Sequence, residues 1–231
     1  MATGVKISPS IFYSDFLHLE DQVAQALSGG CEFVHMDILD GKFTSDISFG
    51  PQVVKALAPM IHRAGAGVDV HLMIEEPERY VPRFVIAGAD IVTIHVEVSK
   101  DVQGTLKAIR IHGARAGLAV RMKTPLLSIQ AALPLADLVL VLSADPGEGA
   151  QAFPDSCLAR VRRIRELLDG MNSMAELEAE GGIAAGNALA AAEAGASILV
   201  AGESVFKTGT PVAEAVHILR DAAEKIPSKA R

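Results

Sequence analysis

The amino-acid sequence contains no tryptophan, and aromatic side chains make up only 4% of its 231 residues. Half of the residues are hydrophobic, so Ala, Val, Ile and Leu must build most of the core. This composition is typical of helices packed on a parallel sheet and argues against an antiparallel sandwich. A chain of this length can bury a sizeable core and commonly forms one domain.

Cysteine is also scarce: only Cys31 and Cys157 are present, far apart and without a CxxC or Cys/His spacing. The sequence therefore predicts neither a disulfide framework nor a cysteine zinc site. No apolar run approaches the roughly 20 residues of a membrane span. Residues 1–10 lack the apolar segment of a signal peptide, so we expect a cytoplasmic protein.

Positive charge is outnumbered, because 21 Lys and Arg residues face 28 Asp and Glu residues, for a formal net charge of -7. An acidic protein is poorly suited to a general nucleic-acid or anionic-membrane surface. We therefore expect no nucleic-acid or membrane partner, and a small molecule as the ligand.

Short apolar runs rich in β-branched residues alternate with segments of helical period along the chain. The expected strands lie within residues 5–12, 31–41, 68–74, 90–97, 116–120, 137–144, 174–182 and 197–206. The expected helices lie within residues 15–30, 50–65, 77–89, 101–114, 125–136, 155–170, 184–196 and 211–226. Eight pairs without a linker predict an α/β protein with a single (β/α)8 TIM barrel domain over residues 1–231, and a frayed tail at about 227–231.

Polar residues late in a strand of such a barrel are candidates for chemistry, because the active site lies at the C-terminal ends of the strands. His35 and Asp37 leave one face of the second strand, His71 comes late in the third, and Glu180 comes late in the seventh. Two imidazoles and two carboxylates suit one divalent metal ion, Zn, Fe, Mn or Co. Alternatively, the carboxylates only hydrogen-bond the histidines as polar caps on the core.

Glycine-rich loops follow the last three predicted strands. Their residues are Gly147, Gly149 and Ala150 after the sixth strand, Gly181 and Gly182 after the seventh, and Gly202 and Glu203 after the eighth. Backbone N–H groups of such loops form the common phosphate site of a barrel. Each loop alone could be ordinary turn chemistry, but their succession favours an anion site.

Seven motifs occur in one order along the chain: ISPSIF, VHMDILDGKF, DVHLMIEEPERY, TIHVE, SADPGEGAQAF, EGGI and VAGESVF. By these motifs the chain resembles the ribulose-phosphate 3-epimerase family over nearly its whole length. The resemblance implies a TIM barrel that inverts C3 of a ketose phosphate, with ribulose 5-phosphate as the family's usual substrate. It also implies a homo-oligomer.

The resemblance carries over residue by residue. It makes His35, Asp37, His71 and Glu180 ligands of one divalent metal ion. Asp37 and Glu180 would double as the catalytic acid/base pair, with Ser10 orienting Asp37. The resemblance also implies substrate contacts by His71, Met73 and the glycine-rich loops, and we expect a further contact from Arg121, which departs from the family pattern. A cation would stabilise the enediolate, while inversion needs one carboxylate to remove the proton and another to return it from the far side.

Several positions depart from the family pattern. Glu180 stands where Asp is usual, and Leu39 and Leu142 stand where Met is typical. Arg121 lies where the family has an Asn-Pro pattern. In the phosphate loops Glu148, Ala150 and Glu203 replace an aromatic residue, Gly and Ser. Glu203 could point outward or pair with Arg121 or Lys207, or it could weaken the phosphate site by charge repulsion.

Three alternatives to this hypothesis stay open. The same chemistry could act on another sugar phosphate, or on an unphosphorylated or acidic sugar, which Arg121, Glu148 and Glu203 favour. A lyase or decarboxylase of a related barrel would place Lys beside the Asp of the third strand, and DVHLM contains none. A non-catalytic relative would have no reason to keep both histidines and both carboxylates.

Overall fold

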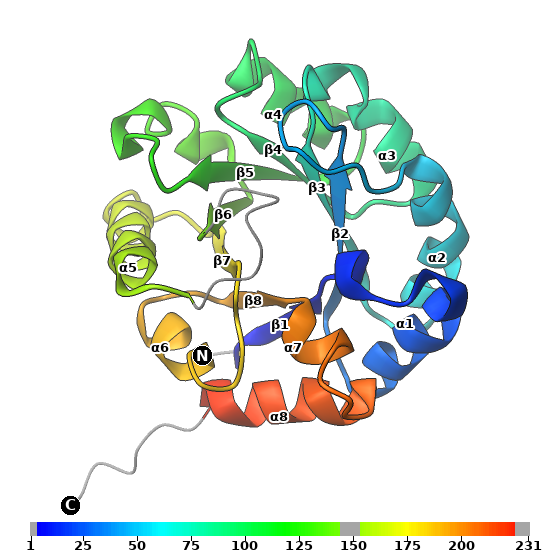
Figure 1. The fold of residues 1–231 in the computed structure, drawn as a ribbon. Helices are drawn as coiled ribbons and strands as arrows, with labels where there is room; N and C mark the ends of the chain where they lie inside the picture. Colours follow the sequence, from blue (N-terminus) through cyan, green and yellow to red (C-terminus); the bar gives the residue numbers. More distant parts are fainter. Residues whose placement is uncertain (1–3, 144–152, 225–231) are drawn as a thin grey trace, which may run out of the picture.

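The structure is a computed structural model that describes residues 4–143 and 153–224. In these residues eight parallel strands form a barrel, and helices form a layer around it (Figure 1). The strands are β1 Lys6–Pro9, β2 Phe33–Leu39, β3 Gly67–Met73, β4 Ile91–His95, β5 Arg115–Arg121, β6 Leu138–Leu142, β7 Glu176–Glu180 and β8 Ile198–Ala201. The predicted frayed tail at about 227–231 lies outside the described residues.

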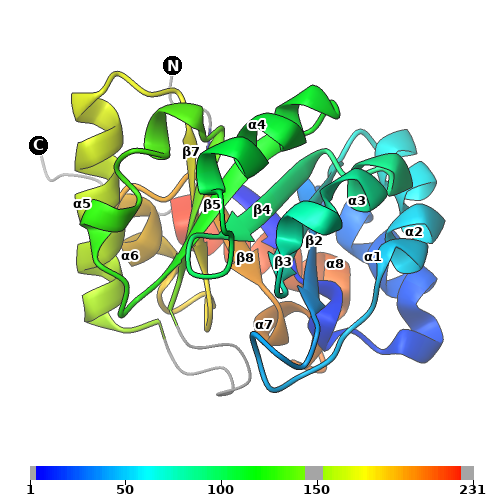
Figure 2. The same cartoon turned by 90° about the horizontal axis from the view of Figure 1, so that it is seen from above.

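The strands are ordered β1-β8-β7-β6-β5-β4-β3-β2, which is the order of a barrel wound once around. A parallel bridge between Ser10 and His35 joins β1 to β2. The predicted single (β/α)8 TIM barrel is therefore confirmed. Figure 2, turned by 90°, shows that the loop after β2 and the short helix α7 lie at one end of the barrel.

Seven of the expected helices are present. The helices of the described residues are α1 Leu19–Ser28, α2 Pro51–Arg63, α3 Val81–Ala87, α4 Val102–Ile111, α5 Asp155–Gly170, α6 Ala188–Glu193, α7 Glu203–Phe206 and α8 Val212–Glu224. Their starts follow local chemistry. Pro51 opens α2, where its missing N–H is not needed, and the Asp101 carboxylate caps α4 by accepting from the Gly104 N–H.

One expected helix, at 125–136, is wrong. Between β5 and β6 the chain instead forms two short 3-10 turns, Leu126–Ser128 and Leu133–Leu135. Pro134 explains the difference, because proline inside a helix removes a hydrogen bond and clashes with the preceding turn. The structure also adds α7, which the sequence did not predict, directly after β8.

The inside of the barrel holds both polar and apolar side chains. An apolar cluster includes Ala119, Leu140 and Ile198 from β5, β6 and β8, and also Leu39, Met73 and Ile91 from β2, β3 and β4. Strands β1, β2, β3, β4 and β7 contribute the buried polar side chains of Ser8, Ser10, His35, Asp37, Asp69, His71, Thr93, His95, Glu178 and Glu180. The ionisable groups therefore lie in an otherwise apolar interior.

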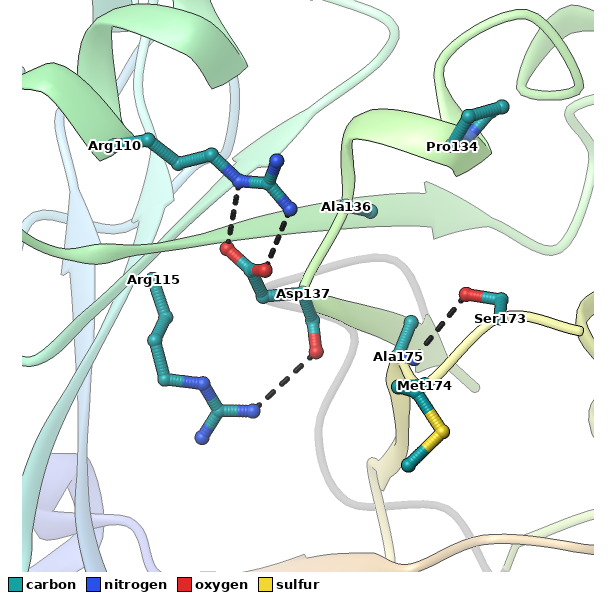
Figure 3. Close-up of a pocket in the computed structure, with 8 residues that line it drawn as sticks. All are labelled: Arg110, Arg115, Pro134, Ala136, Asp137, Ser173, Met174 and Ala175. Carbon is teal, nitrogen blue, oxygen red and sulfur yellow. Dashed lines mark hydrogen bonds and ion pairs between the residues drawn. The ribbon is translucent and has the colours of Figure 1, made fainter.

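The end of the barrel where the strands begin carries ion pairs. Arg110 donates to both carboxylate oxygens of Asp137 at 3.0 and 2.6 Å, and Arg115 pairs with Glu176 at 2.5 Å. Figure 3 shows the pocket of about 330 Å³ beside them, lined by Arg110, Arg115 and Asp137 among others. Its arginines are already paired, which fits the structural role of this end of a TIM barrel.

None of the described helices is both long and apolar enough to cross a bilayer.

Gly117 on β5 lies opposite Thr93 on β4, at a point where the barrel interior leaves no room for a side chain. A Cβ at Gly117 would lie 2.0 Å from Thr93 Oγ1. Gly117→Ala should therefore destabilise the fold by about 1 to 3 kcal/mol, which lowers the melting temperature by at least about 2 °C.

Gly186→Ala is the matched control, because a Cβ there meets open space. Thermal unfolding followed by circular dichroism checks both variants. Equal melting temperatures for Gly117→Ala and the parent would show that the barrel can widen at this point.

Candidate active site

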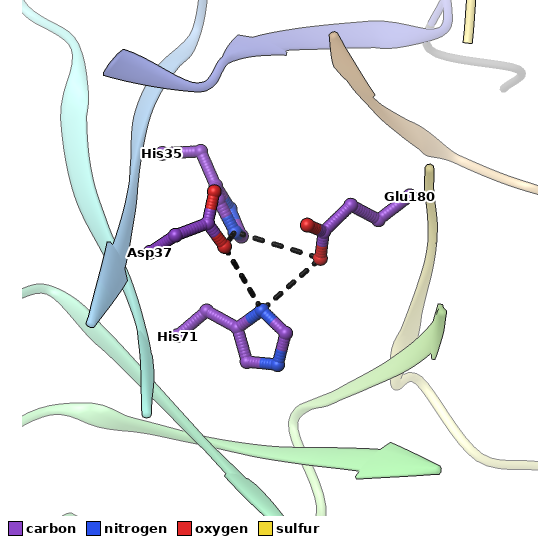
Figure 4. A group of neighbouring side chains, drawn as sticks. All are labelled: His35, Asp37, His71 and Glu180. Carbon is purple, nitrogen blue, oxygen red and sulfur yellow. Dashed lines mark hydrogen bonds and ion pairs between the residues drawn. The ribbon is translucent and has the colours of Figure 1, made fainter. Parts of the chain in front are cut away.

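Four ionisable side chains meet inside the barrel at the ends of three strands (Figure 4). His35 and Asp37 come from β2, His71 from β3 and Glu180 from the last position of β7. They are 0%, 4%, 0% and 9% exposed, respectively. One potential ligand atom from each lies within 4.8 Å of those of the other three. The four residues singled out in the sequence thus form one buried cluster.

Strand pairing produces this cluster. The parallel register of β2 and β3 sets Asp37 beside His71, and His35 beside Asp69. Since side chains alternate along a strand, these residues all point into the barrel. Glu180 reaches the same point from β7, across the interior.

The distances within the cluster suit a shared cation. His35 Nε2 lies 3.2 Å from Asp37 Oδ1 and 3.7 Å from Glu180 Oε2. His71 Nδ1 lies 3.3 Å from Asp37 Oδ1 and 3.0 Å from Glu180 Oε2. Among the described residues, neither His35 Nε2 nor Glu180 Oε2 has a hydrogen-bond partner of good geometry. Buried polar atoms without partners are uncommon, and a divalent cation between these nitrogens and oxygens would satisfy them.

Asp37 is held from both its side chain and its backbone. Ser10 Oγ donates to Asp37 Oδ2 at 2.5 Å, and Ser48 Oγ donates to the Asp37 carbonyl oxygen at 2.6 Å. The Ser10 contact is the geometry that the family resemblance implied. It leaves Asp37 Oδ1 facing both histidines.

The environment drives the two carboxylates in opposite directions. Burial disfavours ionisation of Asp37, but the charge of His35 and the hydrogen bond with His71 outweigh it and lower the pKa of Asp37. Burial raises the pKa of Glu180, and repulsion by Asp37 adds to that rise. Carboxyl groups separated in this way are typical of an acid/base pair.

The pKa values of the buried histidines also shift in opposite directions, upward for His35 and His71 and downward for His95. Burial opposes the charged form of His71, but Glu180 and Asp37 raise its pKa to about 9. The pKa of His35 also rises against burial, chiefly through the charges of Asp69 and Asp37. Burial and the neighbouring His71 lower the pKa of His95 to about 4, so His95 is neutral at pH 7.

A second polar layer lies directly beneath the cluster, and the sequence analysis missed it. It consists of Asp69 and Glu178, both 0% exposed, with Ser8 Oγ 3.4 Å from Asp69 Oδ2. Burial and the charge of Asp69 raise the pKa of Glu178. The signal was present, because Asp69 and Glu178 stand two residues before His71 and Glu180, which places them on the same strand face.

Aromatic rings extend the cluster toward β5. The His71 and His95 rings lie 4.9 Å apart between centroids with their planes 23° apart, and Phe43 from the loop after β2 packs on His95 at 4.8 Å. Arg121, the last residue of β5, has its guanidinium carbon 3.8 Å from the Phe43 ring centre and donates to the Phe43 carbonyl oxygen. Met73 is buried beside Leu39 and Leu142 in the apolar cluster.

The described parts of the glycine-rich loops lie next to the cluster in sequence. Gly181 follows Glu180 with a φ of 97°, and a Cβ there would lie 2.1 Å from Ser143 Oγ, so only glycine fits. Gly182 comes next, and Gly202 precedes α7. Glu203, the first residue of α7, is exposed. Gly147, Glu148, Gly149 and Ala150 lie outside the described residues.

Comparison with known proteins identifies relatives along nearly the whole chain. The ribulose-phosphate 3-epimerase of Synechocystis sp. is 36% identical over 232 residues, which cover 100% of this chain and 99% of that protein. The chloroplastic ribulose-5-phosphate-3-epimerase of Arabidopsis thaliana is 40% identical and covers 88% and 72%, respectively. The Escherichia coli enzyme is 37% identical over 200 residues, which cover 87% of this chain and 88% of that enzyme.

Solved structures of low identity share the barrel. A 3-hexulose-6-phosphate synthase aligns with a TM-score of 0.70 at 19% identity, covering 94% of this chain and 99% of the other. The orotidine 5'-phosphate decarboxylase of Pyrococcus horikoshii aligns with a TM-score of 0.69 at 16% identity, covering 95% and 100%. At such identities the similarity shows the fold alone.

The relatives are isomerases, so the expected enzyme class is confirmed. A model of the ribulose-phosphate 3 epimerase family matches residues 6–206, a span that contains all four cluster residues. The chain belongs to the ribulose-phosphate 3-epimerase family.

Proposed function

We propose that the protein is a metal-dependent 3-epimerase that interconverts ketose phosphates, with ribulose 5-phosphate and xylulose 5-phosphate as the reacting pair. The observation that carries the proposal is the meeting of two imidazoles and two carboxylates, within 4.8 Å, where strands of an epimerase-family barrel end. The relatives at 36% to 40% identity are ribulose-phosphate 3-epimerases, which supports the substrate class.

Asp37 and Glu180 are the proposed acid/base pair. They approach from β2 and β7, so a sugar held between them would present its C3 to a carboxylate on each side. One of the two carboxyl groups accepts the C3 proton and the other supplies one from the opposite side, and the roles exchange in the reverse direction. Ser10, through its hydrogen bond, keeps Asp37 aimed.

His35, Asp37, His71 and Glu180 are the proposed ligands of one divalent metal ion, Zn, Fe, Mn or Co, since these metals accept imidazole with carboxylate. When bound, the cation supplies electrostatic stabilisation of the negative charge that develops on the substrate oxygens. The surrounding side chains exclude water: Leu39, Met73 and Leu142 are at most 5% exposed. Their apolar surface strengthens every charge interaction in the site.

The phosphate group is proposed to lie over the glycine-rich loops after β6, β7 and β8. Gly181, Gly182 and Gly202 support this, because glycine lets backbone N–H groups approach an anion closely. The exposure of Glu203 supports an outward carboxylate that leaves this space open. We also propose single-domain, cytoplasmic subunits, as the composition favours, and a homo-oligomer, as the family resemblance implies.

A second candidate keeps this chemistry and changes the sugar. Arg121 favours it, because its guanidinium stands at the end of β5 against Phe43, whose ring packs on His95 of the site. A cation there would suit an additional acidic or hydroxyl group on the substrate.

Exchange of the C3 proton tests the proposed reaction. In deuterated water, the metal-replete protein should incorporate deuterium at C3 of ribulose 5-phosphate and form xylulose 5-phosphate. Glu180→Gln should lower the rate by at least about 100-fold, because the proton donor is lost. Nuclear magnetic resonance follows the exchange, and metal content is measured in each sample.

Glu193→Gln, on the exposed surface of α6, is the control and should exchange like the parent. Loss of exchange without loss of metal assigns Glu180 a proton-transfer role. A metal-loaded parent without exchange would contradict the proposed substrate.

The affinity of the site for a metal ion should rise with pH. The pKa of His71 is raised to about 9 in the metal-free protein, so below pH 9 a cation must displace a proton from His71. Apparent Co²⁺ affinity should rise about tenfold per pH unit for each displaced proton between pH 6 and 9. Competition with a chromophoric chelator measures it. His62→Ala, outside the cluster, should keep the same slope, and a flat profile would contradict the assignment of His71 as a ligand.

A substrate panel separates the two candidate substrates. Ribulose 5-phosphate should exceed other ketose phosphates, unphosphorylated sugars and acidic sugars in kcat/KM by at least about tenfold, a difference of about 1.4 kcal/mol. Arg121→Met should raise KM for the best substrate more than it lowers kcat if Arg121 binds it. Lys107→Met, an exposed charge removed from α4, is the control. A better acidic sugar, lost in Arg121→Met, would favour the second candidate.

A further inference from the structure

Each histidine of the cluster has its second ring nitrogen held by a buried group outside the cluster. His35 uses Nδ1 and His71 uses Nε2 for these outer contacts. The nitrogens that face the cluster are therefore different, Nε2 on His35 and Nδ1 on His71. A neutral imidazole carries one hydrogen, so an outer contact that fixes that hydrogen also fixes which nitrogen can bind a metal.

For His35 the outer partner is Asp69. Nδ1 lies 2.6 Å from Asp69 Oδ2, and both side chains are fully buried. A carboxylate can only accept, so Nδ1 carries the hydrogen and Nε2 keeps its lone pair toward Asp37 and Glu180. Glu178 in the same layer lies 3.9 Å from this nitrogen, too far for a hydrogen bond.

For His71 the outer partner is a relay. Glu97 Oε2 lies 3.0 Å from His95 Nδ1, and His95 Nε2 lies 2.9 Å from His71 Nε2. The Glu97 carboxylate accepts from Nδ1 of His95, so His95 Nε2 has a lone pair that accepts from Nε2 of His71. His71 Nδ1 then keeps its lone pair for the cluster.

Glu97 is itself anchored. Its Oε1 accepts from the Arg121 backbone N–H at 2.9 Å and from Thr124 Oγ1 at 2.5 Å. The relay therefore starts from the end of β5 and runs through β4 to β3.

A second cation among His35, Asp69 and Glu178 is the competing interpretation, because these three also lie within 4.8 Å of one another. The 2.6 Å contact argues against it. Two ligands each about 2.0 to 2.2 Å from one metal ion in tetrahedral geometry lie more than about 3 Å apart. The distance between His35 Nδ1 and Asp69 Oδ2 is that of a hydrogen bond.

We propose that Asp69 and the His95–Glu97 relay are positioning residues that set the tautomers of His35 and His71 in opposite senses and thereby set the affinity of the metal site. The proposal rests on the proposed function only in placing a divalent cation in the cluster. The residues touch neither substrate nor cation and act through the two histidines.

Metal affinity tests the proposal with a matched pair of variants. Asp69→Asn should bind Co²⁺ about 10 to 100-fold more weakly than the parent, because loss of an outer contact typically costs this much and an amide can present its own hydrogens to the ring. Glu178→Gln changes a carboxyl group of the same buried layer that makes no hydrogen bond to His35. It should stay within about threefold of the parent.

His95→Phe tests the relay, since it keeps an aromatic ring and removes the acceptor for His71. It should also weaken Co²⁺ binding by about 10 to 100-fold. Melting temperatures of the metal-free variants report folding separately. Equal losses in Asp69→Asn and Glu178→Gln, or parent-like affinity in Asp69→Asn and His95→Phe, would overturn the proposal.

Nitrogen NMR of the Zn²⁺-loaded parent decides the case even if a variant fails to fold. The ring hydrogen should be on Nδ1 in His35 and on Nε2 in His71, and the opposite placement in either ring would refute the proposal. A parent that binds no Co²⁺ or Zn²⁺ overturns both this proposal and the metal-dependent function. A parent that binds metal but exchanges no ketose phosphate overturns the function alone, and the affinities still decide the positioning roles.

Discussion

The structure depends on one constraint: charges buried inside the barrel must neutralise one another. Asp37, Asp69, Glu178 and Glu180 bring four carboxyl groups into an interior that is at most 9% exposed at any of them. Isolated charges there would cost several kcal/mol each. The imidazoles of His35 and His71 lie between the carboxylates, so each charge has a counterpart within about 4 Å. A cation in the upper layer would complete this balance.

The cluster and the polar layer beneath it differ in how fully their hydrogen-bonding groups are used. The upper layer, with Asp37 and Glu180, has atoms whose hydrogen-bonding capacity is unused by the described residues. The lower layer, with Asp69, is drawn tightly onto His35. The apolar cluster inside the barrel is buried with these layers and keeps the dielectric low. The four cluster residues and the two carboxyl groups beneath them all come from strands of the barrel.

Much of this arrangement could be predicted from the sequence. Alternating strands and helices gave the barrel, and two-residue spacing gave the common face of His35 and Asp37. The prediction of a helix at 125–136 was wrong because Pro134 interrupts the segment, which forms two short 3-10 turns. Asp69 and Glu178 were missed because acidic residues in the middle of a strand look unfavourable until the partner strands are known. The contact of Arg121 with Phe43 depends on loop geometry, which periodicity does not encode.

The anchoring of Glu97 has a consequence for how such an enzyme can change over evolution. The Arg121 side chain contacts Phe43 beside the cluster, and the Arg121 backbone also holds the carboxylate that leads to His71. An insertion or a backbone shift at this point would disturb His71, through Glu97 and His95, together with the contact between Arg121 and Phe43. New specificities are therefore reached more readily by exchanging side chains at positions 121 to 124 than by rebuilding the loop. Arg121 is a change of that kind: its side chain departs from the family pattern, while its backbone N–H still donates to Glu97.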